Sequence, residues 1–167
     1  PKALVDANSI MNAAYAVHWG GLLKDRRFQI PFKALGYEAK VISASRFIND
    51  NMAKNVARKV IMHVFRNAPD VNNARVLVKG VTFKENVSDI RNSKIVDTVK
   101  EIQAFNIKVD VEDPFAELDE VEHEYGLHLT RRERNDYDAV VIAIPHSTYK
   151  DLTEDYFCSI TKPTALI

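Results

Sequence analysis

Residues 80–93 contain the groups of this chain best suited to bind an anion. The stretch reads Gly80-Val81-Thr82-Phe83-Lys84-Glu85-Asn86-Val87-Ser88-Asp89-Ile90-Arg91-Asn92-Ser93. Lys84 and Arg91 bracket its centre, and a helix pattern follows it, so that free backbone N–H groups at the helix start would also favour a phosphate or a carboxylate. The same spacing equally suits surface ion pairs of Lys84 with Glu85 and of Arg91 with Asp89, which are common and weakly stabilising.

Three further residues have side chains with potential chemistry. Asp113 follows an alternating apolar run and precedes proline, where it could meet a ribose hydroxyl; the interpretation we favour is a turn aspartate. His146 follows the most apolar run of the chain, and we expect a structural role because no acidic partner or nucleophile can be named for it. Cys158 is the only cysteine, and we expect a small apolar side chain near the last strand.

The composition restricts the possible partners. Lysine plus arginine equals aspartate plus glutamate at 23 each, which argues against nucleic acid or an anionic membrane as the partner. No apolar run reaches the roughly 20 residues of a membrane span. The first residues lack the pattern of a signal peptide, and one cysteine suits a reducing compartment. We therefore expect a cytoplasmic protein.

Residues 71–167 alternate between strand and helix patterns. A short β-branched run, Val76–Gly80, leads through the anion-binding stretch to a helix that Asn92 or Ser93 is placed to cap. The continuous run Ala139–Ile144 is typical of a strand buried on both faces. The other expected elements are a helix over Ile95–Ile102, a strand over Ile107–Val111, a helix over Glu117–Tyr125, a brief strand over Leu127–Leu129 and a last strand at Ala165–Ile167. The pattern predicts an α/β fold with a doubly wound, Rossmann-like parallel sheet, in which the first two runs are inner strands.

Residues 1–70 are expected to form a helical segment in front of this domain. Val5–His18 has the spacing of a short helix, whereas Trp19–Phe32 has no periodicity. A helix of about six turns over Ser43–Arg66 repeats apolar residues every fourth position. Its apolar stripe is wider than one sheet face needs, so we expect it to contact another copy of the chain in a homodimer.

The anion-binding stretch also carries a specific family resemblance. Its Gly80-Val81-Thr82-Phe83-Lys84 and Asp89-Ile90-Arg91-Asn92-Ser93 resemble the Gly-x-Thr-Phe-Lys and Asp-x-Arg-x-Ser signature of the UDP-glucose/GDP-mannose dehydrogenase family. Segments upstream and downstream, among them 109–114 and 137–146, are similar to the same family. The resemblance covers nearly everything except residues 20–34, and it is closest to the branch that acts on UDP-N-acetylhexosamines.

The resemblance implies a two-fold oxidation of the C6 alcohol of a UDP-sugar to a carboxylate, with two NAD consumed and with covalent intermediates on a cysteine. It implies that residues 71–167 are the C-terminal nucleotide-sugar-binding domain. Phe83 and Lys84 match positions that contact the UDP-sugar, and Arg91 matches one that reaches the NAD phosphates. These three residues are the candidate site.

Other parts of the family pattern are not found in this sequence. Gly20-Gly21-Leu22-Leu23 stands where the family's catalytic loop has Gly-Gly-His-Cys. The nucleophilic cysteine and the N-terminal NAD-binding domain are therefore expected to be absent, and the chain alone to be inactive. We expect the segment 20–34 to have lost residues, which a Cα separation far above the ordinary 3.8 Å would reveal. The alternative is a noncatalytic nucleotide-sugar-binding or assembly module.

Overall fold

Four parallel strands form one sheet in the order β2-β1-β3-β4. The computed structural model describes residues 40–167. The strands are β1 (Arg75–Lys79), β2 (Lys108–Glu112), β3 (Tyr137–Ile142) and β4 (Thr161–Leu166). β1 and β3 pair with each other in the middle of the sheet, with Val78 beside Val141. Both runs predicted to be inner strands are therefore confirmed in that place.

The connections between the strands carry the helices of the doubly wound fold. They are α4 (Ile95–Gln103), α5 (Leu118–Tyr125) and α6 (Glu154–Ile160), with short 3-10 turns at Val71–Asn73 and Ser147–Tyr149. The helices expected after the first two strands are confirmed. The brief strand expected over Leu127–Leu129 is reduced to a single bridge between Leu129 and Val111, and the last strand begins at Thr161, earlier than the apolar triplet indicated.

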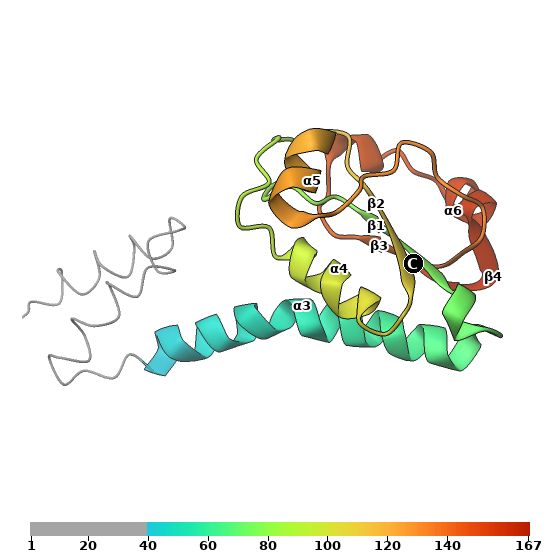
Figure 1. Cartoon of the computed structure of the whole chain (residues 1–167), viewed down its shortest axis with the longest axis horizontal. Coiled ribbons are helices and arrows are strands. Elements are labelled where there is room, and N and C mark those ends of the chain that lie inside the picture. Colours follow the sequence, from blue (N-terminus) through green and yellow to red (C-terminus); the bar gives the residue numbers. More distant parts are fainter. Residues whose placement is uncertain (1–39) are drawn as a thin grey trace, which may run out of the picture. The chain divides into compact units, whose positions relative to one another are not determined.

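Helices cover both faces of the sheet (Figure 1). The side chains of Val76 and Val78 point into a core that includes residues of α4 and the buried Val121 of α5. Leu77 points to the opposite face, where it packs with Ile160 of α6. Because successive strand residues alternate between faces, the continuous apolar run of β1 supplies both cores.

The long helix α3 (Lys40–Asn67) confirms the helix predicted over Ser43–Arg66. Residues Ile48–Ile167 form one compact unit, and the inner side of α3 joins the same core as β1 through Ala57, Val60, Ile61 and Val64. Its other side leaves large apolar residues exposed, among them Ile48, Met52 and Phe65. The division at residue 70 stays a prediction, and the short helix, the aperiodic segment and the chain gap predicted before residue 35 lie outside the described residues.

Gly80 sets the direction in which the chain leaves β1. Its φ is +92°, and a Cβ atom there would lie 2.7 Å from the Cβ of Ile144. Its N–H donates to the carbonyl of Glu112 at 2.7 Å. A side chain at this position would be strained and would clash, so only glycine lets the β1–α4 turn begin beside β3.

Candidate functional site

The β1–α4 turn, residues 80–94, is built by hydrogen bonds and by asparagines in the left-handed conformation. The N–H of Phe83 donates to the carbonyl of Asp89 at 2.7 Å and closes the turn. Asn86 and Asn92 have φ of 57° and 62°, a region that asparagine tolerates better than most residues. Helix α4 begins at Ile95, and Lys94 at its N-cap position makes no side-chain capping bond. The hydroxyl of Ser93 accepts the N–H of Ile95 at 3.3 Å, so Ser93, one of the two residues predicted to cap the helix, does bond to its first turn.

Asp113 fixes the first residues of this turn from the end of β2. Its Oδ2 accepts the N–H groups of Val81 at 2.7 Å and Thr82 at 3.0 Å, while its Oδ1 accepts those of Phe115 at 2.8 Å and Ala116 at 3.1 Å. Burial opposes the charge, but these N–H groups outweigh it and hold the pKa of Asp113 below its usual value. The turn role favoured from the sequence is confirmed, and the carboxylate additionally ties β2 to the turn after β1.

His146 is completely buried between Asp113 and the turn. Its Nε2 lies 3.2 Å from Asp113 Oδ2, and its Nδ1 accepts the N–H of Asn86 at 2.9 Å. The ring packs against Phe115, with centroids 4.8 Å apart, and against the edge of Tyr149. Because Nδ1 accepts a hydrogen bond, the ring is the neutral tautomer with its proton on Nε2. The structural role is confirmed, but the expectation that no acidic partner exists was wrong.

The three candidate binding residues lie on the outside of the turn. Phe83 is 56% exposed, and Lys84 and Arg91 are also exposed. Arg91 forms a fork with Asp89, at 2.9 Å from Nε and 2.8 Å from Nη2, so one of the two surface pairs considered from the sequence is formed. Within residues 40–167 the ammonium of Lys84 makes no ion pair. The convergence of Lys84 and Arg91 on one crevice stays a prediction.

A second polar cluster at the carboxyl edge of the sheet was missed by sequence reasoning. Lys79, only 3% exposed, ends β1 and forms salt bridges with Glu112 at 2.9 Å and with Glu133. It also donates to the hydroxyl of Tyr156 at 3.1 Å. Burial opposes its charge, but the hydrogen bonds to these partners outweigh burial and raise the pKa of the ammonium. Burial and the hydrogen bond to Glu133, 2.5 Å long, raise the pKa of Tyr156 to about 12.

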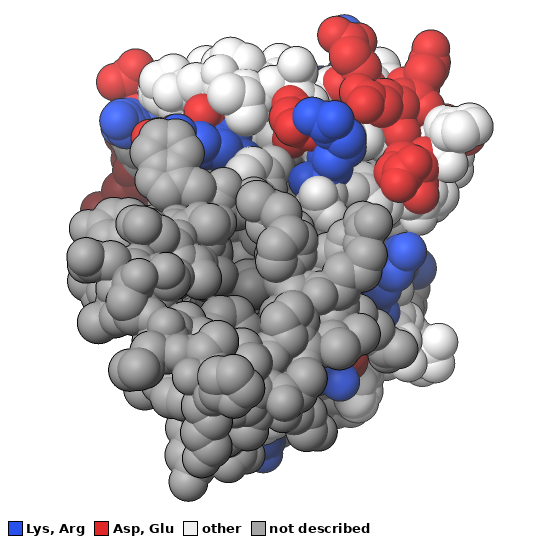
Figure 2. Space-filling model, turned by 90° about the vertical axis from the view of Figure 1, so that its left-hand side faces the viewer, with Lys and Arg blue, Asp and Glu red and all other residues white. Residues whose placement is uncertain are grey.

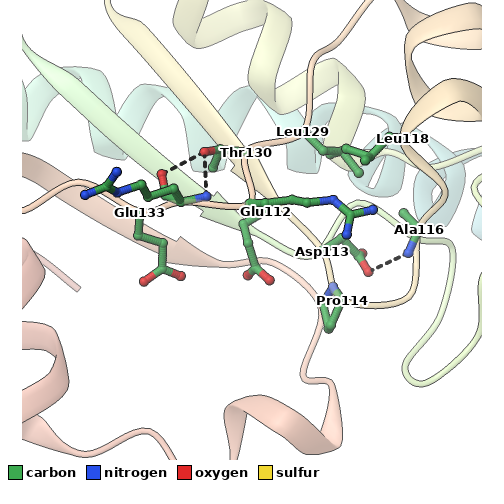
Figure 3. Close-up of a pocket in the computed structure, with 10 residues that line it drawn as sticks. Glu112, Asp113, Pro114, Ala116, Leu118, Leu129, Thr130 and Glu133 are labelled. Atoms are coloured by element: carbon green, nitrogen blue, oxygen red, sulfur yellow. Dashed lines mark hydrogen bonds between the residues drawn. The ribbon is translucent and has the colours of Figure 1, made fainter.

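A cavity of about 500 Å³ opens beside this cluster at the end of β2 (Figure 3). Glu112 and Glu133 contribute to its wall, and Arg131 and Arg132 also line it. The remaining lining residues are Asp113, Pro114, Ala116, Leu118, Leu129 and Thr130. None of the three candidate binding residues lines this cavity, so the cavity and the β1–α4 turn are separate features of the same edge.

The other candidates bring no additional chemistry. Cys158 is exposed on α6, which corrects the expectation of an apolar side chain packed near the last strand. The part of the chain that the structure describes has no group of acidic, histidine and cysteine residues suited to a metal ion. No described helix is long and apolar enough to cross a membrane.

Comparison with a family model shows to which family of this general fold the chain belongs. The model for the UDP binding domain of the UDP-glucose/GDP-mannose dehydrogenase family matches residues 77–167, which include the second half of β1, the β1–α4 turn and the other three strands. The chain belongs to this family. The signature residues from which the sequence resemblance was drawn lie within the matched range.

Individual relatives support the same assignment. The chain is 37% identical over 121 residues to the UDP-N-acetyl-D-glucosamine 6-dehydrogenase of Salmonella typhi and 38% identical over 123 residues to Protein CapL of Staphylococcus aureus. These matches cover 72% and 73% of this chain, but the chain spans only 28% and 29% of the length of these relatives.

Solved structures of family members have the same fold. The native UDP-N-acetyl-mannosamine dehydrogenase Cap5O of Staphylococcus aureus superimposes with a TM-score of 0.60 at 30% identity, covering 74% of this chain and 28% of that one. A UDP-glucose dehydrogenase of Pyrobaculum islandicum gives a TM-score of 0.65 at 20% identity, covering 84% and 35%. At that identity the second similarity shows the fold alone.

Proposed function

We propose that this chain is the C-terminal part of an NAD-dependent UDP-sugar 6-dehydrogenase and that it binds the UDP-sugar through the β1–α4 turn. The observation that supports this best is the exposed Lys84, a cation without an ion pair within the described residues, on a turn whose backbone is fixed by hydrogen bonds. The family assignment of residues 77–167 supplies the ligand class. A compact ammonium suits a diphosphate, and the exposed ring of Phe83 beside it offers an apolar surface to the nucleotide sugar.

The cofactor NAD and Arg91 also have defined parts in this proposal. NAD would accept the hydride removed from C6 of the sugar. Arg91 fits a contact with its phosphates, because its side chain is 77% exposed and presents a planar fork of donors. We propose that neither the NAD-binding domain nor the nucleophilic cysteine belongs to these 167 residues, so that the chain binds but does not oxidise. We also propose that it acts in the cytoplasm, where UDP-sugars serve as precursors of surface polysaccharides.

Calorimetric titration with UDP and with UDP-N-acetylglucosamine tests the binding role. Lys84→Ala removes one charged hydrogen bond and should weaken binding by about 1.5 to 3 kcal/mol, roughly 10- to 150-fold. Lys59→Ala makes the same change on an exposed position of α3 and should leave the affinity unchanged. Equal affinities of the Lys84→Ala variant and the wild type would refute the role of Lys84.

The alternative function, a noncatalytic binding or assembly module, is distinguished by activity. The chain is mixed with a separately produced NAD-binding portion of a related dehydrogenase, and NADH formation from the UDP-sugar is followed at 340 nm. We expect no NADH from the chain alone. NADH formed by the mixture would support the role as part of an enzyme, whereas UDP binding without any activity in the mixture would favour the module.

We propose further that two copies of the chain pair through the outer side of α3. Ile48, Met52 and Phe65 expose 57%, 51% and 52% of their surface there, and an exposed apolar helix face is a common basis of symmetric dimers. Sedimentation equilibrium should show a dimer that dissociates in the double variant Ile48→Glu, Met52→Glu. Val87→Glu, which replaces an exposed apolar residue of the turn, should stay dimeric. A monomeric wild type would contradict the proposal.

A further inference from the structure

Asn86, at the tip of the β1–α4 turn, is hydrogen-bonded to the residues that follow β3. The N–H of Asn86 donates to Nδ1 of the buried His146 at 2.9 Å. The side-chain oxygen of Asn86 accepts the N–H of Ser147 at 2.8 Å and its hydroxyl at 2.9 Å. Asn86 is thus joined by three hydrogen bonds to the residues that follow β3.

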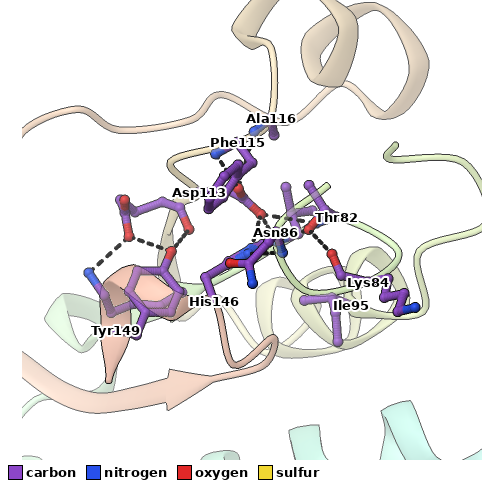
Figure 4. A network of polar contacts seen from close by, with 12 residues as sticks. Thr82, Lys84, Asn86, Ile95, Asp113, Phe115, Ala116, His146 and Tyr149 are labelled. Carbon is purple, nitrogen blue, oxygen red and sulfur yellow. Dashed lines mark hydrogen bonds and ion pairs between the residues drawn. The ribbon is translucent and has the colours of Figure 1, made fainter. Parts of the chain in front are cut away.

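The same buried ring connects the tip to the start of the turn. Nε2 of His146 lies 3.2 Å from Asp113 Oδ2 and 3.2 Å from the hydroxyl of Thr82. Asp113 in turn accepts the N–H groups of Val81 and Thr82, and the hydroxyl of Thr82 donates to the carbonyl of Lys84 at 3.1 Å. The bonded positions therefore lie on both sides of Lys84 in the sequence, as Figure 4 shows.

This network does not fit a catalytic role. Thr82, His146 and Asp113 resemble a nucleophile, a base and an acid, but Thr82 and His146 are both 0% exposed. The hydroxyl of Thr82 donates to a backbone carbonyl instead of to the ring. Ser147, which is exposed, donates its hydroxyl to Asn86 and not to His146. A substrate cannot reach the buried groups, so their effect on a ligand has to pass through the turn.

The physical need for such a network follows from the exposure of the turn. Phe83, Lys84 and Asn86 are exposed, so little apolar burial is available to fix their backbone. Directional hydrogen bonds to buried partners fix it instead, and every buried polar side-chain atom of the described residues has a partner. A binding residue that is already held in place loses less conformational freedom when the ligand binds, which raises affinity.

We propose that Asn86, His146 and Asp113 are positioning residues that hold Phe83 and Lys84 in the geometry that binds the UDP-sugar. The proposal rests on the function proposed above and adds residues that the family resemblance did not indicate. None of the three touches the ligand. They act on affinity by ordering the backbone on either side of Lys84.

Asn86→Gly is the most informative variant, because glycine accepts the positive φ of 57° while the two bonds to Ser147 are lost. Asn106→Gly is the matched control. Asn106 has a φ of 60° and is also exposed, but it lies in the turn between α4 and β2, at the amino edge of the sheet. Both variants are compared with the wild type by urea unfolding, by hydrogen exchange of the amides of residues 82–91 and by calorimetric titration with UDP-N-acetylglucosamine.

In Asn86→Gly, the amides of residues 82–91 should exchange at least fivefold faster than in the wild type. The variant should also bind UDP-N-acetylglucosamine at least fivefold more weakly than the wild type, and its urea unfolding midpoint should equal that of Asn106→Gly. Asn106→Gly should match the wild type in turn exchange and affinity. His146→Asn retains an acceptor near the Nδ1 position and should bind more tightly than His146→Leu, which fills a similar volume but has no hydrogen-bonding group. That ordering is not expected of a residue that only fills space.

Two results with Asn86→Gly would overturn the positioning role alone. Unchanged exchange of residues 82–91 in Asn86→Gly would show that the network does not order the turn. Faster exchange with unchanged affinity would show that this order does not serve binding. A wild-type chain that binds neither UDP nor the UDP-sugar would refute the proposed function itself, and the positioning role with it. The wild-type titration shows this failure before any variant is measured.

Discussion

Replacing Lys79 by methionine should destabilise the chain more than any other single loss of a positive charge within the described residues. Methionine has a similar length and fills the space, so the main change is the loss of the buried charge. Glu112 and Glu133 then remain side by side, 19% and 22% exposed, without the ammonium that neutralises them. Removing one partner of a buried ion pair costs about 3 to 5 kcal/mol. For a chain of this size, that lowers the melting temperature by roughly 10 °C.

Urea unfolding followed by circular dichroism measures this loss. Lys54→Met is the matched control, because Lys54 and Glu101 form a pair 4.0 Å apart whose side chains are 66% and 40% exposed, and such pairs contribute about 0 to 1 kcal/mol. Adding Glu112→Gln and Glu133→Gln to Lys79→Met should recover much of the stability, because the uncompensated charges are gone. A loss below about 1 kcal/mol in Lys79→Met would refute the reasoning from buried charge.

Three further predictions concern the turn and the sheet. Gly80→Ala should cost about 2 to 4 kcal/mol in urea unfolding, since it combines a positive φ with a contact of 2.7 Å to Ile144. A cost below 1 kcal/mol would contradict that packing. The fork with Arg91 lowers the pKa of Asp89 to about 2, so its carbon NMR shift should titrate near pH 2, and the contribution of this pair to stability should be lost only as the pH falls from about 4 through 2. Arg91→Ala should return that midpoint toward 4. Burial raises the pKa of Tyr137 to about 12, so stability should fall as the pH rises from about 10 toward 12, and Tyr137→Phe should reduce this fall.

The sequence predicted the elements well because their signals are local. The apolar runs Val76–Gly80 and Ala139–Ile144 predicted inner strands, and β1 and β3 do lie inside the sheet. The burial expected of the second run was too complete, because β3 ends at Ile142 and that side chain is 42% exposed. Apolar residues recur at every fourth position of α3, and this spacing predicts a helix without reference to the rest of the chain. The strand expected over Leu127–Leu129 was overestimated: β2 is an edge strand with a free outer side, but only one bridge, between Leu129 and Val111, is formed along it.

The polar contacts were harder to predict because they join residues distant in sequence. Lys79 appears in the sequence as a polar residue at a strand end, while its partners lie 33, 54 and 77 residues further on. The order of the strands in the sheet determines which strand ends are neighbours, and no local sequence pattern predicts that order. For Asp113 and His146 a signal did exist. Each closely follows a predicted parallel strand, and the carboxyl ends of parallel strands lie at one edge, so their pairing was open to inference.

If the turn binds as proposed, the fork between Asp89 and Arg91 would let its two cations serve two different ligands. Arg91 is neutralised within the turn at 2.8 to 2.9 Å, so a diphosphate that reaches Lys84 meets one uncompensated charge. A phosphate competes with a carboxylate for the same guanidinium, because both accept its fork of donors. Arg91 would therefore contribute only to a ligand whose own phosphate is held close enough to displace Asp89. In the proposed enzyme the domain that binds NAD would supply such a ligand, so the contribution of Arg91 would depend on that domain being present.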